Sequence, residues 1–278
     1  MLATLIIVFR EVLEAALVVG IVLAASRGVP GRGLWVTAGC GAGVLGAIIV
    51  ASFASEIANA VQGVGQELFN ATILIAAVCM LGWHNIWMSR HGRELATEAT
   101  RIGREVRAGS RPLYALASVC GIAVLREGSE IVLFLYGIAV GGGSSRLGMV
   151  IGGVLGVIAG AIAGAAIYFG LLRIPLRYLF NATSWLILLL AAGMASQAAA
   201  FLAAANVVPT LGNDRWNTSA ILNESSLVGQ LAHVLIGYTA QPAGIQIVFY
   251  VATLVLIGSL MRLLRARPAA RRERQVTP

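Results

Sequence analysis

Seven apolar stretches divide this sequence of 278 residues. A helix of about 20 residues spans the roughly 30 Å hydrocarbon core of a bilayer, and every stretch is at least that long. They cover residues 2–26, 34–55, 68–89, 113–140, 146–172, 180–206 and 244–264. Charged residues make up only 12% of the chain, about half the share in a soluble domain. The sequence therefore predicts an all-α polytopic membrane protein with seven transmembrane helices, and it excludes a soluble enzyme or a disordered chain.

The distribution of arginine predicts how these helices are oriented. The chain has a net charge of +8 and 20 basic residues, all of them Arg. In the connections and the tail, sixteen Arg lie on one side and only Arg146 and Arg215 on the other. Because loops rich in basic residues stay in the cytoplasm, we expect the N-terminus outside and residues 266–278 to form a basic cytoplasmic tail. The basic charge thus indicates contact with membrane lipids and no binding of nucleic acid.

Three motifs recur in the same order in the two halves of the sequence. They are Arg-Glu-x-x-Glu at 10–14 and 126–130, Gly-Val-Leu-Gly at 43–46 and 153–156, and Leu-Phe-Asn-Ala-Thr at 68–72 and 179–183. Two copies of three spans cross the membrane in opposite directions, as in many secondary transporters. We expect a 3+3 inverted-topology repeat plus a seventh helix. A single transport domain, 1–265, would then contain repeat one (1–90), repeat two (113–206), an external loop (207–243) and the seventh helix (244–264).

The Arg-Glu-x-x-Glu motifs lie near the middle of the first and fourth stretches. At about 100° per residue, the three charged residues of each motif share about one third of the helix surface. They are Arg10, Glu11 and Glu14 in the first motif, and Arg126, Glu127 and Glu130 in the second. A charged residue at the centre of a membrane helix costs about 2.5–3.5 kcal/mol, so these groups must face inward and pair. The surplus of carboxylates over guanidiniums predicts a site for a hard metal cation.

The two motifs resemble those of the high-affinity iron permease family, the oxidase-dependent iron transporters of fungi and bacteria. The segments that carry the resemblance are residues 9–15 and 125–130, and residues 216–242 resemble the last external loop of bacterial members. The resemblance implies four iron ligands with two supporting charges. The ligands would be Glu11, Glu14, Glu127 and Glu130, and the supporting charges Arg10 and Arg126.

The resemblance also implies a substrate, partners and a location. Iron would be imported across the bacterial cytoplasmic (inner) membrane as Fe3+. A periplasmic oxidase, or peroxidase-like and cupredoxin-containing partners, would produce it from Fe2+. Iron is then the substrate, and neither a permanently bound cofactor nor enzyme activity is expected. The residues alone leave open a transporter of another heavy metal such as lead, an intramembrane carboxylate-site ferroxidase, and export instead of import.

Polar residues outside the motifs are candidates for a relay into or out of the site. Glu67 and Glu224 lie on the predicted outer side, and His84 lies near the cytoplasmic end of the third stretch. Solvated loop charge is the alternative for the two carboxylates, and packing is the alternative for His84. His233, on the outer side, has the same two interpretations.

Residues 90–112 have the pattern of an amphipathic helix. Leu95, Ala99, Ile102 and Val106 lie on one helical face, with Arg residues around it. Basic amphipathic helices of this kind lie on membrane surfaces, so we expect this segment on the cytoplasmic surface of the bilayer.

Overall fold

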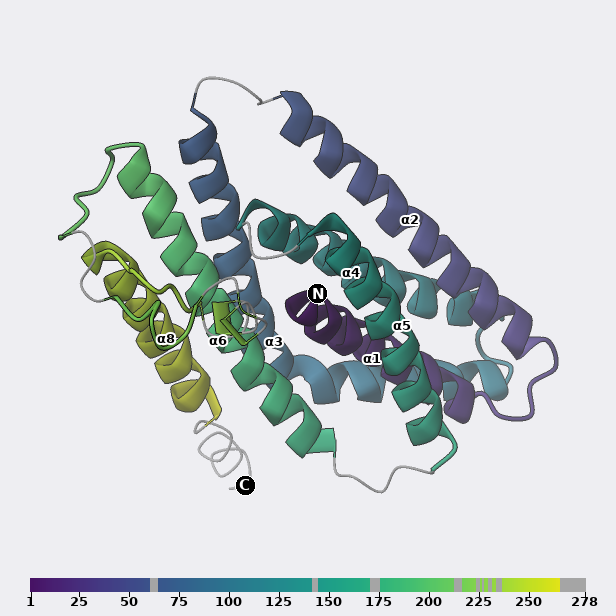
Figure 1. Cartoon of the computed structure of the whole chain (residues 1–278). Coiled ribbons are helices and arrows are strands. Elements are labelled where there is room, and N and C mark those ends of the chain that lie inside the picture. The colour runs from purple at the N-terminus through teal and green to yellow at the C-terminus, as the bar shows by residue number, and fades with distance from the viewer. Residues whose placement is uncertain are drawn as a thin grey trace, which may run out of the picture.

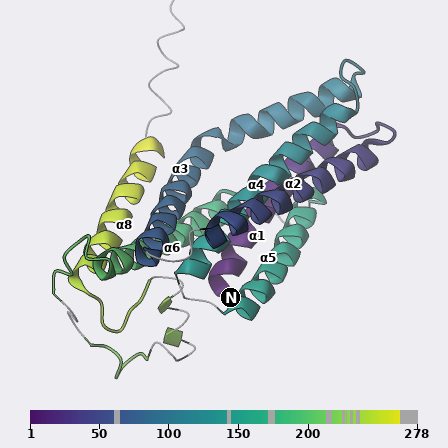
Figure 2. The same cartoon turned by 90° about the horizontal axis from the view of Figure 1, so that it is seen from above.

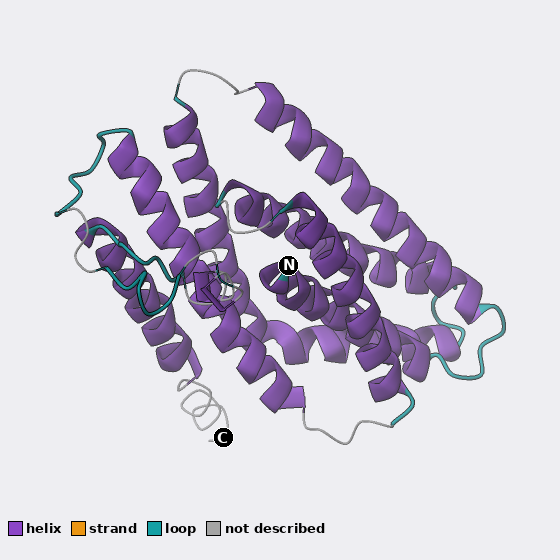
Figure 3. Cartoon of the chain, viewed as in Figure 1, coloured by secondary structure: helices purple, strands orange, loops and turns teal. Residues whose placement is uncertain are grey.

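The computed structural model describes residues 1–60, 65–141, 145–170, 176–212, 217–223, 226, 228–229, 232–233 and 237–265. Every long regular element within them is a helix (Figure 3). The helices are α1 (Leu2–Ala25), α2 (Arg32–Ala60), α3 (Gln66–Arg107), α4 (Tyr114–Val140), α5 (Arg146–Tyr168), α6 (Leu176–Ala204) and α8 (Gly244–Arg265). Each predicted apolar stretch coincides with one of these helices, and the all-α class is confirmed. The basic tail at 266–278 lies outside the described residues.

Five of the described helices have segments long and apolar enough to cross a membrane. These segments are Arg32–Phe53, Gln66–Met88, Arg146–Tyr168, Asn181–Ala204 and Gly244–Leu263. The first and fourth helices differ from them because each carries the three charges of its motif near its centre. The protein is therefore an all-helical, multi-pass membrane protein, and the charges at the centres of α1 and α4 must be kept out of contact with lipid.

The outward faces of α2, α5 and α8 are apolar and exposed. Examples with at least half of their surface exposed are Leu45, Ile49 and Phe53 on α2, Val150, Val154 and Ile162 on α5, and Val248, Val251 and Val255 on α8. Rows of large apolar side chains this extensive are rare on soluble monomers. They form the surface that hydrocarbon covers in a bilayer.

The two motif helices lie in the interior of the bundle (Figures 1 and 2). α1 packs against α5 and α4, and α2 packs mainly against α4. α3 contacts both motif helices and α6, and α8 packs against α6 and α3. Neighbouring helices thus cover the faces of α1 and α4 that carry the motif glutamates.

Glycine allows α1 and α5 to approach closely. Four buried glycines recur at every fourth residue of α5, namely Gly152, Gly156, Gly160 and Gly164. A Cβ added to Gly156 would lie 2.9 Å from the carbonyl oxygen of Leu5 and 2.8 Å from Cβ of Val8. Small residues at this spacing are typical of tightly packed membrane helices, so this interface is fixed by the absence of side chains on α5.

α2 and α4 meet in the same way. A Cβ on Gly43 would lie 2.6 Å from the carbonyl oxygen of Gly121 and 2.8 Å from Cβ of Val124. Gly121 and Val124 stand 116 residues after the α1 residues that contact Gly156, which is the offset of the charged motifs. Gly43 therefore corresponds to Gly156 in contacts. The Gly-Val-Leu-Gly motif of the sequence instead aligns Gly43 with Gly153, which is three residues before the glycine that makes the corresponding contacts.

The predicted amphipathic segment is the second part of α3, which changes direction before it (Figure 2). Its apolar residues Ala99, Ile102 and Val106 are buried, two of them in a cluster with Val22 of α1 and Leu116 of α4. The helical face was predicted correctly. This face packs on neighbouring helices, and the location of the segment on the cytoplasmic surface of the membrane stays a prediction.

Candidate metal centre

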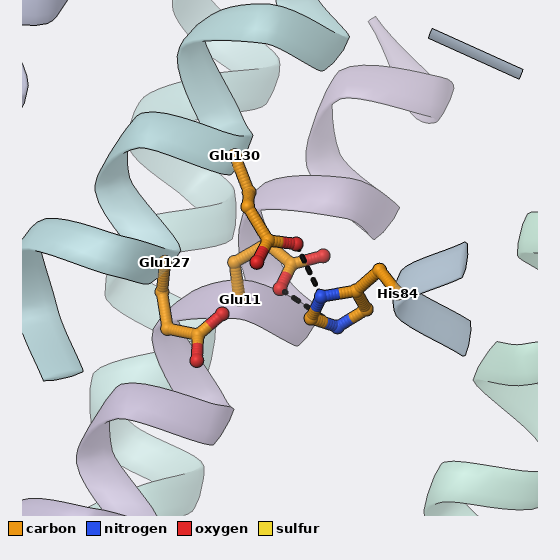
Figure 4. A group of neighbouring side chains, drawn as sticks. All are labelled: Glu11, His84, Glu127 and Glu130. Carbon is orange, nitrogen blue, oxygen red and sulfur yellow. Dashed lines mark ion pairs between the residues drawn. The ribbon is translucent and has the colours of Figure 1, made fainter. Parts of the chain in front are cut away.

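Side chains from three helices converge where α1, α3 and α4 meet (Figure 4). One ligand atom from each of Glu11, His84, Glu127 and Glu130 lies within 4.8 Å of the others, and all four residues are buried. Figure 4 shows the carboxylates of Glu11 and Glu130 directed at the His84 ring, with Glu127 one turn along α4 from Glu130. We call these four residues the acidic cluster.

His84 connects the two motifs. Its Nδ1 is paired with Oε2 of Glu130 on α4. Its Nε2 lies 3.8 Å from Oε2 of Glu11 and 3.5 Å from Oε2 of Glu14, both on α1. The imidazole therefore faces carboxylates from both halves of the chain.

The first motif is sealed inside the protein. Arg10 Nε lies 2.9 Å from Oε1 of Glu14, and its Nη1 lies 3.6 Å from Oε1 of Glu11. All three side chains are almost completely buried. An uncompensated charge at this depth is very unfavourable, so Arg10 balances part of the negative charge of the site.

The second motif is partly open. The Arg126 side chain is 31% exposed and forms an ion pair with Glu127, with its Nε 3.0 Å from Oε1. Its guanidinium lies 5.1 Å from the ring centroid of Trp87, a cation–π distance. Arg10 and Arg126 thus occupy the same position in their motifs, but Arg10 is buried and Arg126 is partly exposed.

Several carboxylate oxygens of the acidic cluster have no hydrogen bond. Among the residues that the structure describes, these include both oxygens of Glu11 and Oε2 of Glu127. Buried polar atoms are nearly always hydrogen-bonded, and leaving one without a partner costs about 1–3 kcal/mol. A cation bound between the carboxylates would satisfy these atoms. Three carboxylates and one imidazole suit a hard to borderline metal ion.

The structure brings together most of the predicted site residues. Glu14 belongs to the same buried network, but Arg10 holds it and the acidic cluster contains His84 in its place. Glu67 is exposed in the first turn of α3, and Glu224 lies outside the described residues. Metal binding by the four motif glutamates and a relay role for Glu67 and Glu224 stay predictions.

The sequence predicted His84 only as a relay residue near the site, whereas the structure shows it in contact with the glutamates of both motifs. The available signal was weak. His84 and Asn85 form a polar pair inside an apolar stretch, and such a residue is by default a functional candidate in a membrane helix. The sequence did not show that α3 packs against both motif helices.

The fold and the site define a class: a multi-pass membrane protein with an intramembrane group of paired charges, as ion-conducting permeases have. The profile of the Iron permease FTR1 family matches residues 1–267, and the chain belongs to this family. It is therefore a membrane protein of an iron-transport family.

Curated relatives agree with this assignment. "Ferrous iron permease EfeU" of Yersinia pestis is 29% identical over 259 residues, which cover 92% of this chain and 91% of the relative. The protein of the same name from Escherichia coli O6:K15:H31 is 27% identical over 251 residues, 87% of this chain and 88% of the relative. No solved structure matches the chain.

Proposed function

We propose that this protein imports iron across the bacterial cytoplasmic membrane and binds the ion at the acidic cluster during transport. The observation that carries the proposal is the convergence of Glu11, His84, Glu127 and Glu130 within 4.8 Å in a member of an iron permease family. Charged groups inside a membrane are rare and mark ion pathways.

The proposed architecture has seven transmembrane helices, with α1–α3 and α4–α6 as inverted repeats. The contacts support it: α1 packs on α5 as α4 packs on α2, and Gly156 and Gly43 occupy corresponding places in the two interfaces. Three spans per repeat reverse the orientation of the second copy. The excess of Arg on one side favours an orientation with the N-terminus outside and the C-terminus in the cytoplasm.

In this orientation the two Arg flank the acidic cluster from opposite sides. Arg10 precedes its glutamates on α1, which runs inward, and Arg126 precedes its glutamates on α4, which runs outward. The buried Arg10 then faces the outside, and the partly exposed Arg126 faces the cytoplasm. We propose that both limit the negative charge of the site without iron and favour release of the ion. Glu14, held by Arg10, is the fourth carboxylate ligand available to the ion.

We propose Fe3+ as the ion in the acidic cluster, because carboxylate oxygens favour hard cations. The relatives are named as ferrous iron permeases, and the proposal accommodates that name if iron arrives as Fe2+. A periplasmic oxidase, or peroxidase-like and cupredoxin-containing partners, would accept one electron from each ion. The chain itself then acts as a permease, with iron as its substrate.

Uptake of radioactive iron tests this function. Cells without their own iron importers would express the chain with and without a periplasmic oxidase, and iron would be offered as Fe2+ kept reduced by ascorbate or as Fe2+ in air. We expect uptake that depends on the chain, increases with the oxidase and is not reduced by excess lead. Uptake of lead in place of iron would overturn the assignment of the metal. A well-expressed chain that transports neither would overturn the function.

A further inference from the structure

A partly open cavity of about 50 Å3 lies beside the acidic cluster, towards the N-terminal end of α1. Its walls come from α1, α4 and α6 and from the segment that contains His233. Most of the wall is apolar, including Ile7, Ile138 and Met194, and the polar side chains are Gln197 and His233. A cavity needs about 10–15 Å3 to hold one water molecule, so this one has room for an ion with one or two waters.

The cavity lies in line with the acidic cluster. Ile7 is one helical turn before Glu11 on α1, and Gly137 is two turns after Glu130 on α4. With a rise of 1.5 Å per residue, the cavity is about 6–10 Å from the cluster along these helices. Ile7 and Phe134, both completely buried, lie at the intervening level. In the proposed orientation the cavity is on the outer side and this apolar layer closes the path inward.

His233 is oriented like a metal ligand. Its Nδ1 lies 2.7 Å from the carbonyl oxygen of Tyr238, which is an acceptor only, so Nδ1 carries the hydrogen. The lone pair of Nε2 then accepts a hydrogen bond from Nε2 of Gln197 at 3.4 Å. Metal-binding histidines typically donate their other ring N–H to a carbonyl or carboxylate in this way. A half-turn of the Gln197 amide would replace its nitrogen by an oxygen ligand.

The segment around His233 is held in place by its own contacts. The Tyr238 hydroxyl donates to the carbonyl oxygen of Leu222 at 2.8 Å and lies 2.6 Å from Oγ1 of Thr218. Gly237 has a φ of 65°, and an added Cβ would collide with the backbone of Gly193 on α6. The close approach puts Gly237 directly against Gly193, which lines the cavity. His233 therefore has a defined position relative to Gln197.

We propose that His233 and Gln197 form an outer binding station where Fe2+ is held before it reaches the acidic cluster. Imidazole nitrogen and amide oxygen suit a borderline divalent ion such as Fe2+. The station is chemically distinct from the carboxylate-rich cluster and precedes the oxidation step. Its place on the uptake path rests on the proposed function, whereas its metal binding does not.

Transport kinetics test its role in uptake. Replacing His233→Ala or Gln197→Ala removes a ligand of the station and leaves the acidic cluster intact. Loss of even an outer-shell partner of a metal ligand typically weakens metal binding by 10–100-fold, so we expect KM for Fe2+ to rise at least roughly tenfold with maximal uptake little changed. Gln241→Ala is the matched control, because Gln241 is exposed in the same external segment and does not line the cavity. Equal KM values for His233→Ala and the control would overturn the role in uptake.

Direct binding tests the station without transport. Purified protein with Glu11, Glu127 and Glu130 changed to Gln would be titrated with Co2+, a spectroscopic substitute for Fe2+. We expect one visible absorption band that is lost when His233→Ala is added, with both proteins monodisperse in detergent. Absence of the band, or its persistence without His233, would overturn the station. If Co2+ binds as expected while the glutamate variants still import iron, the assignment of the acidic cluster fails and the station stands.

Discussion

The imidazole of His84 on α3 is paired through Nδ1 with the carboxylate of Glu130 on α4, and its Nε2 faces Glu11 and Glu14 on α1. One side chain therefore contacts both Arg-Glu-x-x-Glu motifs. α3, which packs against both α1 and α4, therefore joins the carboxylates of the two motifs through one imidazole.

Replacing His84→Ala removes this connection. Since the imidazole is both a candidate ligand and the partner of Glu130, we expect iron uptake to fall by at least about tenfold. Trp83→Phe is the control, because Trp83 is the neighbouring residue and 71% exposed. Uptake would be compared at equal amounts of protein in the membrane. Uptake of His84→Ala at the level of the control would show that the histidine only packs.

The two arginines should differ in their effect on stability. Arg10→Gln leaves buried Glu11 and Glu14 without their cation, and breaking a buried ion pair costs about 3–5 kcal/mol. Arg126 is partly exposed, so Arg126→Gln should cost only about 1–2 kcal/mol, including its contact with Trp87. Thermal unfolding of the purified variants in detergent measures the difference. Equal losses of stability for the two variants, or a larger loss for Arg126→Gln, would contradict the complete burial of the first motif.

Two glycines of α5 provide a test of the helix register. A Cβ at position 156 would lie within 3.0 Å of three α1 atoms, whereas at position 153 it meets only Cγ2 of Thr4, at 3.9 Å. We expect Gly156→Ala to destabilise the protein by about 1–3 kcal/mol through overpacking, and Gly153→Ala to have little effect. Unfolding in detergent again distinguishes them. A larger loss of stability for Gly153→Ala than for Gly156→Ala would instead support the alignment of Gly43 with Gly153.

The approach of α2 to α4 predicts a cross-link. Cys40 on α2 packs against the buried cluster that contains Cys120 on α4, while Cys79 on α3 is exposed. Mild oxidation of membranes with copper phenanthroline should join Cys40 to Cys120. Peptide mass spectrometry after alkylation should then find one cross-linked pair and free Cys79. Alkylation of all three thiols after oxidation would contradict this interface.

The helices and the charged motifs were predictable from sequence because their signals are local. Apolar length sets each span, and the cost of burying Arg10, Glu11 and Glu14 in lipid forces them inward. The spacing of these residues placed them on one face, and the structure shows them in one buried network.

The remaining features depend on packing between distant segments. The sequence marked the apolar face of Ala99, Ile102 and Val106 but not that α1 and α4 cover it. A four-residue glycine motif matched Gly43 to Gly153 by composition, whereas backbone contact selects Gly156. His84 has no partner near it in sequence, and only the assembly of three helices shows its place in the site.

Neutralising the acidic cluster tests the central claim most directly. Glu11→Gln and Glu127→Gln preserve shape and hydrogen-bonding capacity but remove the charge that a cation requires, and Glu98→Gln, at an exposed residue of α3, serves as the control. Radioactive iron uptake would be measured at equal expression in cells without other importers. The account predicts at least a tenfold loss in both cluster variants and normal uptake in the control. Normal uptake with both cluster glutamates neutralised together would contradict it.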